Sequence, residues 1–383
     1  MTTQPSTNDP SSRDTLTLSS PDAFLASVPH MLGFACDDSV VLVGLGPDGD
    51  GRSSQVLLTQ RFNTPPADFD VADVRELARA AADPMARAGS TEVIIAVFGR
   101  QAPIPGGELP SGQLVDDLVT ALDEGGISVK DALFTDGTSR WSYGCDNPTC
   151  CPPEGRVIPA EVRTHVAAEF AVAGAAMLPD RDALVRELAP AEQSIRERVR
   201  ACIEAAGPAP AADSSPRALE GWRDTAITEV TTAICAEGSL PPEEVEKVLV
   251  GLGDIRVRDT VLWEMSQSPD RPRAAINGLS ALVRSAPEGH VAPAATVLAI
   301  AHWLGGDGAR ANVALDRALA DDPDYSLGRM VSAALRSGLP PQSWRDAMSG
   351  LSRDTCRHGM DRPDPAPKPA APSVAPASPG LTL

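Results

Sequence analysis

Residues 39–45 read SVVLVGL and residues 91–98 read TEVIIAVF, and these two runs decide the fold of the N-terminal part of the chain. Both are rich in Val and Ile, which favour β-strands, and a shorter run of the same kind follows at residues 55–59. Neither long run alternates with polar residues, a pattern typical of strands that are buried on both faces. The three runs therefore predict strands of a sheet.

Helical patterns alternate with these strands. A first helix begins after Ser20, and Pro29 within it is expected to kink or shorten it. Asp70 begins a second helix, and Ser111 caps a third whose apolar residues recur at spacings of three and four. This alternation predicts an α/β domain of two or three layers over residues 15–158.

From residue 159 onward every periodic segment has helical spacing, so residues 159–350 are predicted to form an all-α domain. Short Gly, Pro or Asp breaks separate the segments. The expected helices cover residues 195–206, 216–235, 242–251, 254–265, 273–285, 292–304, 309–320 and 325–336.

The last helices of this domain, near residues 292–336, resemble a tetratricopeptide pair. Small and large apolar residues share one helix face, and Asp322 and Pro323 break the pattern before the next helix. A single such pair is equally compatible with the cap of a helical bundle, because a solenoid needs about three repeats. A tetratricopeptide-like surface would bind a protein or peptide partner.

The ends of the chain and its charge restrict where the protein acts. Residues 1–14 and 351–383 have the composition of disordered segments, the latter a Pro/Ala tail.

No run of about 18 apolar residues and no secretory signal is found, which predicts a cytoplasmic protein without a membrane partner. The chain has 33 Lys and Arg against 52 Asp and Glu, a formal net charge of −19, which excludes nucleic-acid binding driven by bulk charge.

Gly44, Gly46 and Gly49 match the dinucleotide-binding pattern G-x-G-x-x-G directly after a strand. The pattern requires a helix to follow, whereas residues 53–59 have strand character, so we expect a polar hairpin turn instead. Small-molecule binding near residues 44–51 or 99–107, at the ends of the strands, stays a further hypothesis that rests on fold analogy.

The most unusual segment is WSYGCDNPTCCPPEG at residues 141–155, which places Cys145, Cys150 and Cys151 in a loop rich in turn-forming residues. With Asp136, Asp146 or His165 as a fourth ligand, the three thiolates could form a zinc site. The spacing disfavours zinc, because adjacent cysteines are expected to point apart.

Two other interpretations of these cysteines stay open. One cysteine could be an activated thiol that a second resolves, although no activating partner is evident in the sequence. Alternatively, all three are small buried residues that pack a turn near the domain border, which we favour. No catalytic residue or bound cofactor is otherwise predicted, since the chain contains no HExxH, GxSxG or Walker motif.

Four segments together resemble a family that is found in actinobacteria and known only as a domain of unknown function. They are SPDAFLASVPHMLGF at 20–34, DSVVLVGL at 38–45, the cysteine loop at 141–155 and AHWLGGDGARANVALDRALADDPDYSL at 301–327. The resemblance implies no activity, ligand or catalytic residue.

These observations favour a non-enzymatic interaction or regulatory protein, and whether it is an enzyme stays open. The alternative is a thiol- or metal-dependent enzyme that uses Cys145, Cys150 and Cys151.

Overall fold

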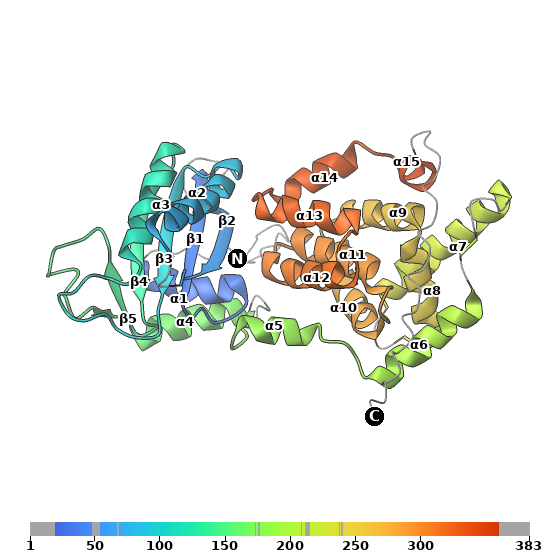
Figure 1. Cartoon of the computed structure of the whole chain (residues 1–383), viewed down its shortest axis with the longest axis horizontal. Coiled ribbons are helices and arrows are strands. Elements are labelled where there is room, and N and C mark those ends of the chain that lie inside the picture. Colours follow the sequence, from blue (N-terminus) through green and yellow to red (C-terminus); the bar gives the residue numbers. More distant parts are fainter. Residues whose placement is uncertain are drawn as a thin grey trace, which may run out of the picture. The chain divides into compact units, whose positions relative to one another are not determined.

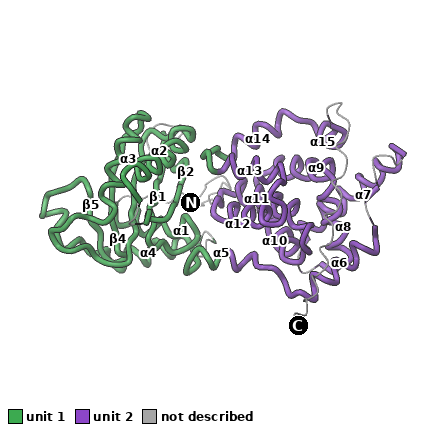
Figure 2. The backbone as a smooth tube through the Cα atoms, in the orientation of Figure 1, with its two compact units in different colours: residues 1–184, 336–340 green, residues 185–335, 341–383 purple. Residues whose placement is uncertain are grey.

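The computed structural model describes residues 20–47, 54–66, 69–172, 174, 177–207, 209–210, 215–236, 238 and 240–359. The chain divides into two compact units, residues 1–184 with 336–340 and residues 185–335 with 341–383 (Figure 2). The first unit is α/β and the second is all helical, which confirms the predicted fold class. The disorder expected for residues 1–14, and for residues 360–383 of the predicted tail, falls on residues outside the described ranges.

A six-stranded mixed sheet forms the centre of the first unit (Figure 1). Its strand order is β2-β1-β3-β4-β5-β6, and among these neighbours only β3 and β4 run parallel. The strands are β1 (Ser39–Pro47), β2 (Ser54–Asn63), β3 (Glu92–Phe98), β4 (Ser128–Thr135), β5 (Ser139–Ser142) and β6 (Arg156–Val157).

Helices cover both faces of this sheet, so the unit has three layers. Alternate residues of β1 enter two different cores: Val40 and Leu42 pack toward helices α2 (Val71–Arg87) and α3 (Gly112–Glu124). Val41 and Val43 pack with α1 (Pro21–Leu32), which contacts α4 (Ala160–Val172). Every residue of β1 before Pro47 is buried, which confirms the prediction of a strand covered on both faces. The unit includes α4, beyond the domain boundary expected at residue 158.

The helix starts agree with the sequence except at one position. The Ser20 hydroxyl accepts from the Ala23 N–H, and Asp70 forms a capping box with Asp73. Helix α1 continues through Pro29 to its end at Leu32, so Pro29 does not shorten it. The prediction that Ser111 caps α3 is wrong for the side chain: Ser111 adopts a left-handed conformation with φ 61°, and its hydroxyl makes no capping hydrogen bond.

The glycine pattern after residue 43 belongs to a hairpin, as predicted. Gly44 and Gly46 lie within β1, which pairs antiparallel with β2, so no helix N-terminus follows to receive a phosphate. Residues 48–53, which join the two strands and include Gly49, lie outside the described ranges. Gly44 is needed for packing, because a Cβ there would lie 2.3 Å from the Ser90 hydroxyl oxygen.

The eight helices predicted for the second half are all present, with bounds shifted by at most a few residues. Residues 353–358, for which the composition predicts a disordered tail, form a short helix that the Ser352 side chain caps. The helices are α5 (Arg181–Glu187), α6 (Gln193–Ala206), α7 (Pro216–Ile234), α8 (Pro242–Gly253), α9 (Ile255–Ser266), α10 (Asp270–Ser285), α11 (Val291–Leu304), α12 (Gly308–Asp321), α13 (Ser326–Arg336), α14 (Pro341–Ser349) and α15 (Arg353–His358).

Helix α11 is the centre of the second unit (Figure 1). Every residue of α11 except Pro293 is buried, and the helix contacts α8, α9, α10, α12 and α14. The Asp321 carboxylate of α12 accepts hydrogen bonds from the backbone N–H groups of Gly289, Val291 and Ala292, which satisfies the buried N-terminus of α11. Within the described ranges, no helix is both long and apolar enough to cross a membrane.

The crossing of α7 and α10 gives a stability test. A Cβ at Gly278 would lie 2.3 Å from the carbonyl oxygen of Ile234, which is backbone and cannot rotate away. We expect Gly278→Ala to lower the free energy of unfolding by about 1–3 kcal/mol through overpacking. At Gly221 of α7 a Cβ would meet nothing within 4 Å. Gly221→Ala should therefore raise the free energy of unfolding by about 0.5–1 kcal/mol, because alanine loses less conformational freedom in a helix than glycine does. Urea unfolding of both variants checks this, and equal effects would contradict the assigned packing.

Candidate functional site

The cysteine loop follows β5, which Figure 1 labels, and connects it to β6, the last strand in the order of the sheet. β5 and β6 form a short antiparallel pair in which Ser139 faces Val157 and Arg140 faces Arg156. Residues 143–155 therefore form one long hairpin connection, and both of its ends are held by the sheet.

Trp141 anchors this loop to the core of the unit. This residue is 6% exposed, and the centroid of its ring lies 5.7 Å from that of Phe134. Its indole N–H donates to the Pro153 carbonyl oxygen at 3.2 Å. Gly155 has φ +83°, and a Cβ there would lie 2.4 Å from the indole ring. Only glycine combines this left-handed backbone with so close an approach to Trp141.

A turn that begins at Asn147 brings the three cysteines together. The Asn147 carbonyl oxygen accepts from the N–H groups of Cys150 and Cys151, at 3.2 and 2.8 Å. The Asn147 side chain accepts from the Thr149 N–H at 3.0 Å and tightens the same turn. As a result, the Sγ atoms of Cys145 and Cys150 lie 3.2 Å apart. All three Sγ atoms lie within 4.8 Å of one another.

This geometry corrects two expectations from the sequence. The argument that Cys150 and Cys151 point apart holds for an extended chain, whereas here both residues belong to one tight turn and their sulfurs converge with Cys145. The expectation that the cysteines are buried packing residues is also wrong, because Cys150 is exposed and the other two are half-buried. The cluster is therefore accessible to solvent.

The pKa values of Cys145 and Cys151 are shifted in opposite directions. The Asn147 N–H, which hydrogen-bonds the Cys145 sulfur, lowers the pKa of Cys145, and the neighbouring thiols of Cys150 and Cys151 lower it further. Burial, followed by the hydrogen bonds and charge of the other two sulfurs, raises the pKa of Cys151 to about 12. Of these two thiols, Cys145 is therefore the one that ionises more readily.

The residues predicted as fourth metal ligands do not join the cluster. The Asp136 carboxylate accepts from the backbone N–H groups of Thr138 and Ser139, and His165 pairs with Glu169 at 3.2 Å on α4. Asp146 is close enough for its charge to act on Cys145. No carboxylate or imidazole of the described residues completes a fourth corner with the three sulfurs.

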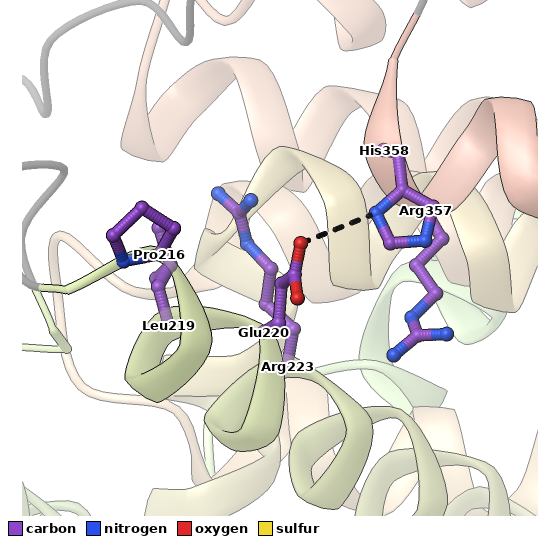
Figure 3. Close-up of a pocket in the computed structure, with 6 residues that line it drawn as sticks. All are labelled: Pro216, Leu219, Glu220, Arg223, Arg357 and His358. Atoms are coloured by element: carbon purple, nitrogen blue, oxygen red, sulfur yellow. Dashed lines mark ion pairs between the residues drawn. The ribbon is translucent and has the colours of Figure 1, made fainter.

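A small cavity in the second unit is the other candidate site (Figure 3). Its volume is about 220 Å³, and α7 and α15 line it with Pro216, Leu219, Glu220, Arg223, Arg357 and His358. His358 faces Glu220 at 3.9 Å, Arg223 pairs with Asp254 at 2.9 Å, and Arg357 pairs with Asp224. Each charged side chain of the cavity has an ion-pair partner within the protein, and the volume is below the usual range for ligand pockets, so the cysteine loop is the stronger candidate.

The dependence of the loop on Trp141 can be tested with two glycines of similar positive φ. Gly155 and Gly137 have φ +83° and +86°, but a Cβ at Gly137 would meet nothing within 4 Å. Gly137→Ala should cost only the left-handed backbone term, about 1–2 kcal/mol of unfolding free energy. Gly155→Ala should cost clearly more, because the methyl group also displaces the indole ring. Urea unfolding measures both, and equal losses would argue against the anchoring role of Trp141.

The family model described as Domain of unknown function (DUF4192) matches residues 21–342. No curated protein and no solved structure matches the chain. The matched range includes the sheet, the cysteine loop and the helices up to the start of α14. The chain therefore belongs to the DUF4192 family of domains of unknown function.

Proposed function

We propose that the protein binds Zn²⁺ through the thiolates of Cys145, Cys150 and Cys151. The observation that carries this proposal is the convergence of the three Sγ atoms within 4.8 Å on one exposed, anchored loop. Sulfur ligands select soft or borderline metal ions, and zinc is the divalent ion most often bound by cysteine clusters of this kind. The cytoplasmic location expected from the sequence supports the proposal, since thiols stay reduced there.

The distances fit a zinc ion with only small adjustments. A Zn–S bond of about 2.3 Å places the sulfurs of a tetrahedral site about 3.8 Å apart. The Cys145–Cys150 separation of 3.2 Å is shorter than this, and the upper limit of 4.8 Å for the group is longer. Movements of less than about 1 Å in an exposed loop would reach the required geometry. The Asn147 N–H that hydrogen-bonds the Cys145 sulfur would also stabilise the bound thiolate.

Cobalt substitution tests this directly. We expect the full chain to bind one Co²⁺ with intense sulfur-to-metal charge-transfer absorption and the visible bands of a tetrahedral site, and Zn²⁺ to displace it. Cys150→Ser should weaken binding by more than the roughly 100-fold that outer-shell changes reach. Cys235→Ser is the matched control, because Cys235 is also exposed but lies outside the cluster. Binding that survives Cys150→Ser, or that Cys235→Ser equally reduces, would overturn the zinc proposal.

A second candidate function, thiol chemistry, is favoured by the 3.2 Å approach of Cys145 and Cys150. The two sulfurs need to move about 1.2 Å closer to form a disulfide of normal length. Formation of this bond releases two protons and passes two electrons to an oxidant, such as a low-molecular-weight disulfide. Cys151, whose sulfur lies in the same group, would then be the remaining thiol.

Oxidation of the metal-free protein distinguishes this candidate from a purely metal-binding role. With oxidised glutathione we expect a loss of two hydrogens that peptide mass spectrometry assigns to a Cys145–Cys150 bond, also in Cys151→Ser. The protein preloaded with Zn²⁺ should resist, because the metal occupies the same thiolates. A stable glutathione adduct on Cys145 without the internal bond would count against the second candidate.

The role as a non-enzymatic interaction or regulatory protein belongs to the helical unit and stays a prediction. Helices α11, α12 and α13 cover the segment near residues 292–336 that resembles a tetratricopeptide pair, and Met330 of α13 is 56% exposed. These features support a protein or peptide partner for this unit, whereas the proposed zinc site belongs to the α/β unit. Actinobacterial origin likewise stays a prediction.

A further inference from the structure

Among the described residues, no further cysteine or histidine joins the three thiolates of the proposed zinc site, which leaves one coordination position for another ligand. All seven cysteines and five histidines belong to the described residues, and the ranges outside the description contain neither residue type. Only Cys145, Cys150 and Cys151 form a group with metal-ligand geometry within the described ranges. Three protein ligands and an open fourth position are the arrangement of a zinc site that binds an external molecule.

The other candidate ligands of the α/β unit are occupied elsewhere. Cys36 is 8% exposed, and burial raises the pKa of its thiol to about 12. His30 stacks on Phe170, with ring centroids 5.0 Å apart. His165 is paired with Glu169 on α4. Completing the shell from within this unit with sulfur or nitrogen would therefore require one of these contacts to break.

The open position is accessible from solvent. Cys150 is exposed, and Cys145 and Cys151 are half-buried, so the three sulfurs form a cluster on the surface rather than a closed cage. The Trp141 and Gly155 contacts fix the two ends of the loop but leave the cysteine turn itself outside the core. A small molecule can thus approach the metal without unfolding the loop.

The ligand chemistry follows from the three thiolates. Zn²⁺ with three thiolates carries a net charge of −1, which makes it a weak Lewis acid toward water compared with a site of neutral imidazoles. A metal ion that three sulfur ligands already soften prefers a further soft ligand to an oxygen ligand. We infer that the fourth ligand is the sulfur of an external low-molecular-weight thiol.

Binding this ligand is a balanced step that needs no oxidant. The thiol loses its proton to solvent, its sulfur forms a bond to the metal, and the water molecule that held the fourth position leaves. The bound thiolate is then held at neutral pH although the free thiol is mostly protonated. This inference rests on the proposed zinc function and names the class of ligand for the same site.

The test uses the cobalt-loaded full chain and 2-mercaptoethanol as the probe. We expect saturable binding that raises the sulfur-to-cobalt charge-transfer absorption by about one third, as the thiolates increase from three to four, while the tetrahedral bands persist. Ethylene glycol, the matched hydroxyl compound, should leave the spectrum unchanged. Cys235→Ser should respond as the unchanged chain does, because Cys235 is not part of the cluster.

The outcomes separate this inference from the zinc proposal. If cobalt binds but 2-mercaptoethanol leaves its spectrum unchanged, the external-thiol inference is wrong and the metal site stands. The same conclusion follows if imidazole replaces the fourth ligand and 2-mercaptoethanol does not. If cobalt fails to bind to the reduced chain at all, the zinc proposal itself is overturned, and the inference with it.

Discussion

The contact between Trp141 and Gly155 is the constraint on which the candidate site depends. The loop between β5 and β6 is mostly exposed, and such a segment gains little from burial to offset the entropy of ordering it. Trp141 connects the loop to buried structure, because its side chain belongs to the hydrophobic core beside the sheet. Its indole N–H also donates a hydrogen bond to the Pro153 carbonyl oxygen of the loop. The position of Gly155 on the ring then fixes the return of the chain. With both ends of the loop fixed in this way, the turn that begins at Asn147 brings three sulfur atoms together at the surface.

Each unit is built around one element that is buried on all sides, and this explains where a reactive group can lie. β1 contributes alternate residues to two cores, and α11 is surrounded by helices, so both are buried along almost their whole length and are rich in small and aliphatic residues. A thiol inside such a core is inert: burial strongly raises the pKa of Cys36. Accessible sulfur chemistry requires a loop at the sheet end, where Cys145 and Cys150 lie.

Most of the fold could be predicted because its elements follow hydrophobic periodicity. The β1–β2 hairpin was predictable from strand character after the glycine pattern, and the helices from Gln193 to Arg336 from their spacing and breaks. β4 and β5 were missed, since the run SVKDALFT mixes charged and apolar residues and β5 has only four residues. Helix α15 was missed because RDTCRH has almost no apolar residues, and its support comes from distant partners such as Asp224 and Glu264.

The candidate site shows a different limit of sequence reasoning. The three cysteines were identified, but their convergence depends on one carbonyl, that of Asn147, accepting two consecutive N–H groups. The Asn-Pro-Thr sequence before Cys150 was the available signal, because it favours a turn rather than an extended chain. The rule that neighbouring side chains point apart is a property of strands and fails in such a turn.

One set of sulfurs serves both proposed chemistries, and this makes them mutually exclusive. Zinc binding needs the thiolates of Cys145 and Cys150, and a disulfide between the same two residues removes both, leaving Cys151 as a single ligand of negligible affinity. A third thiolate raises the cost of keeping the cluster ionised, since burial, followed by the other two sulfurs, raises the pKa of Cys151 to about 12. The metal-free cluster is therefore the form that an oxidant would attack, and the metal-bound cluster the form that resists it. Loss of the metal would expose the thiols to oxidation, and oxidation would prevent the metal from binding. A regulatory protein with this cluster would therefore respond both to the supply of zinc and to the presence of an oxidant.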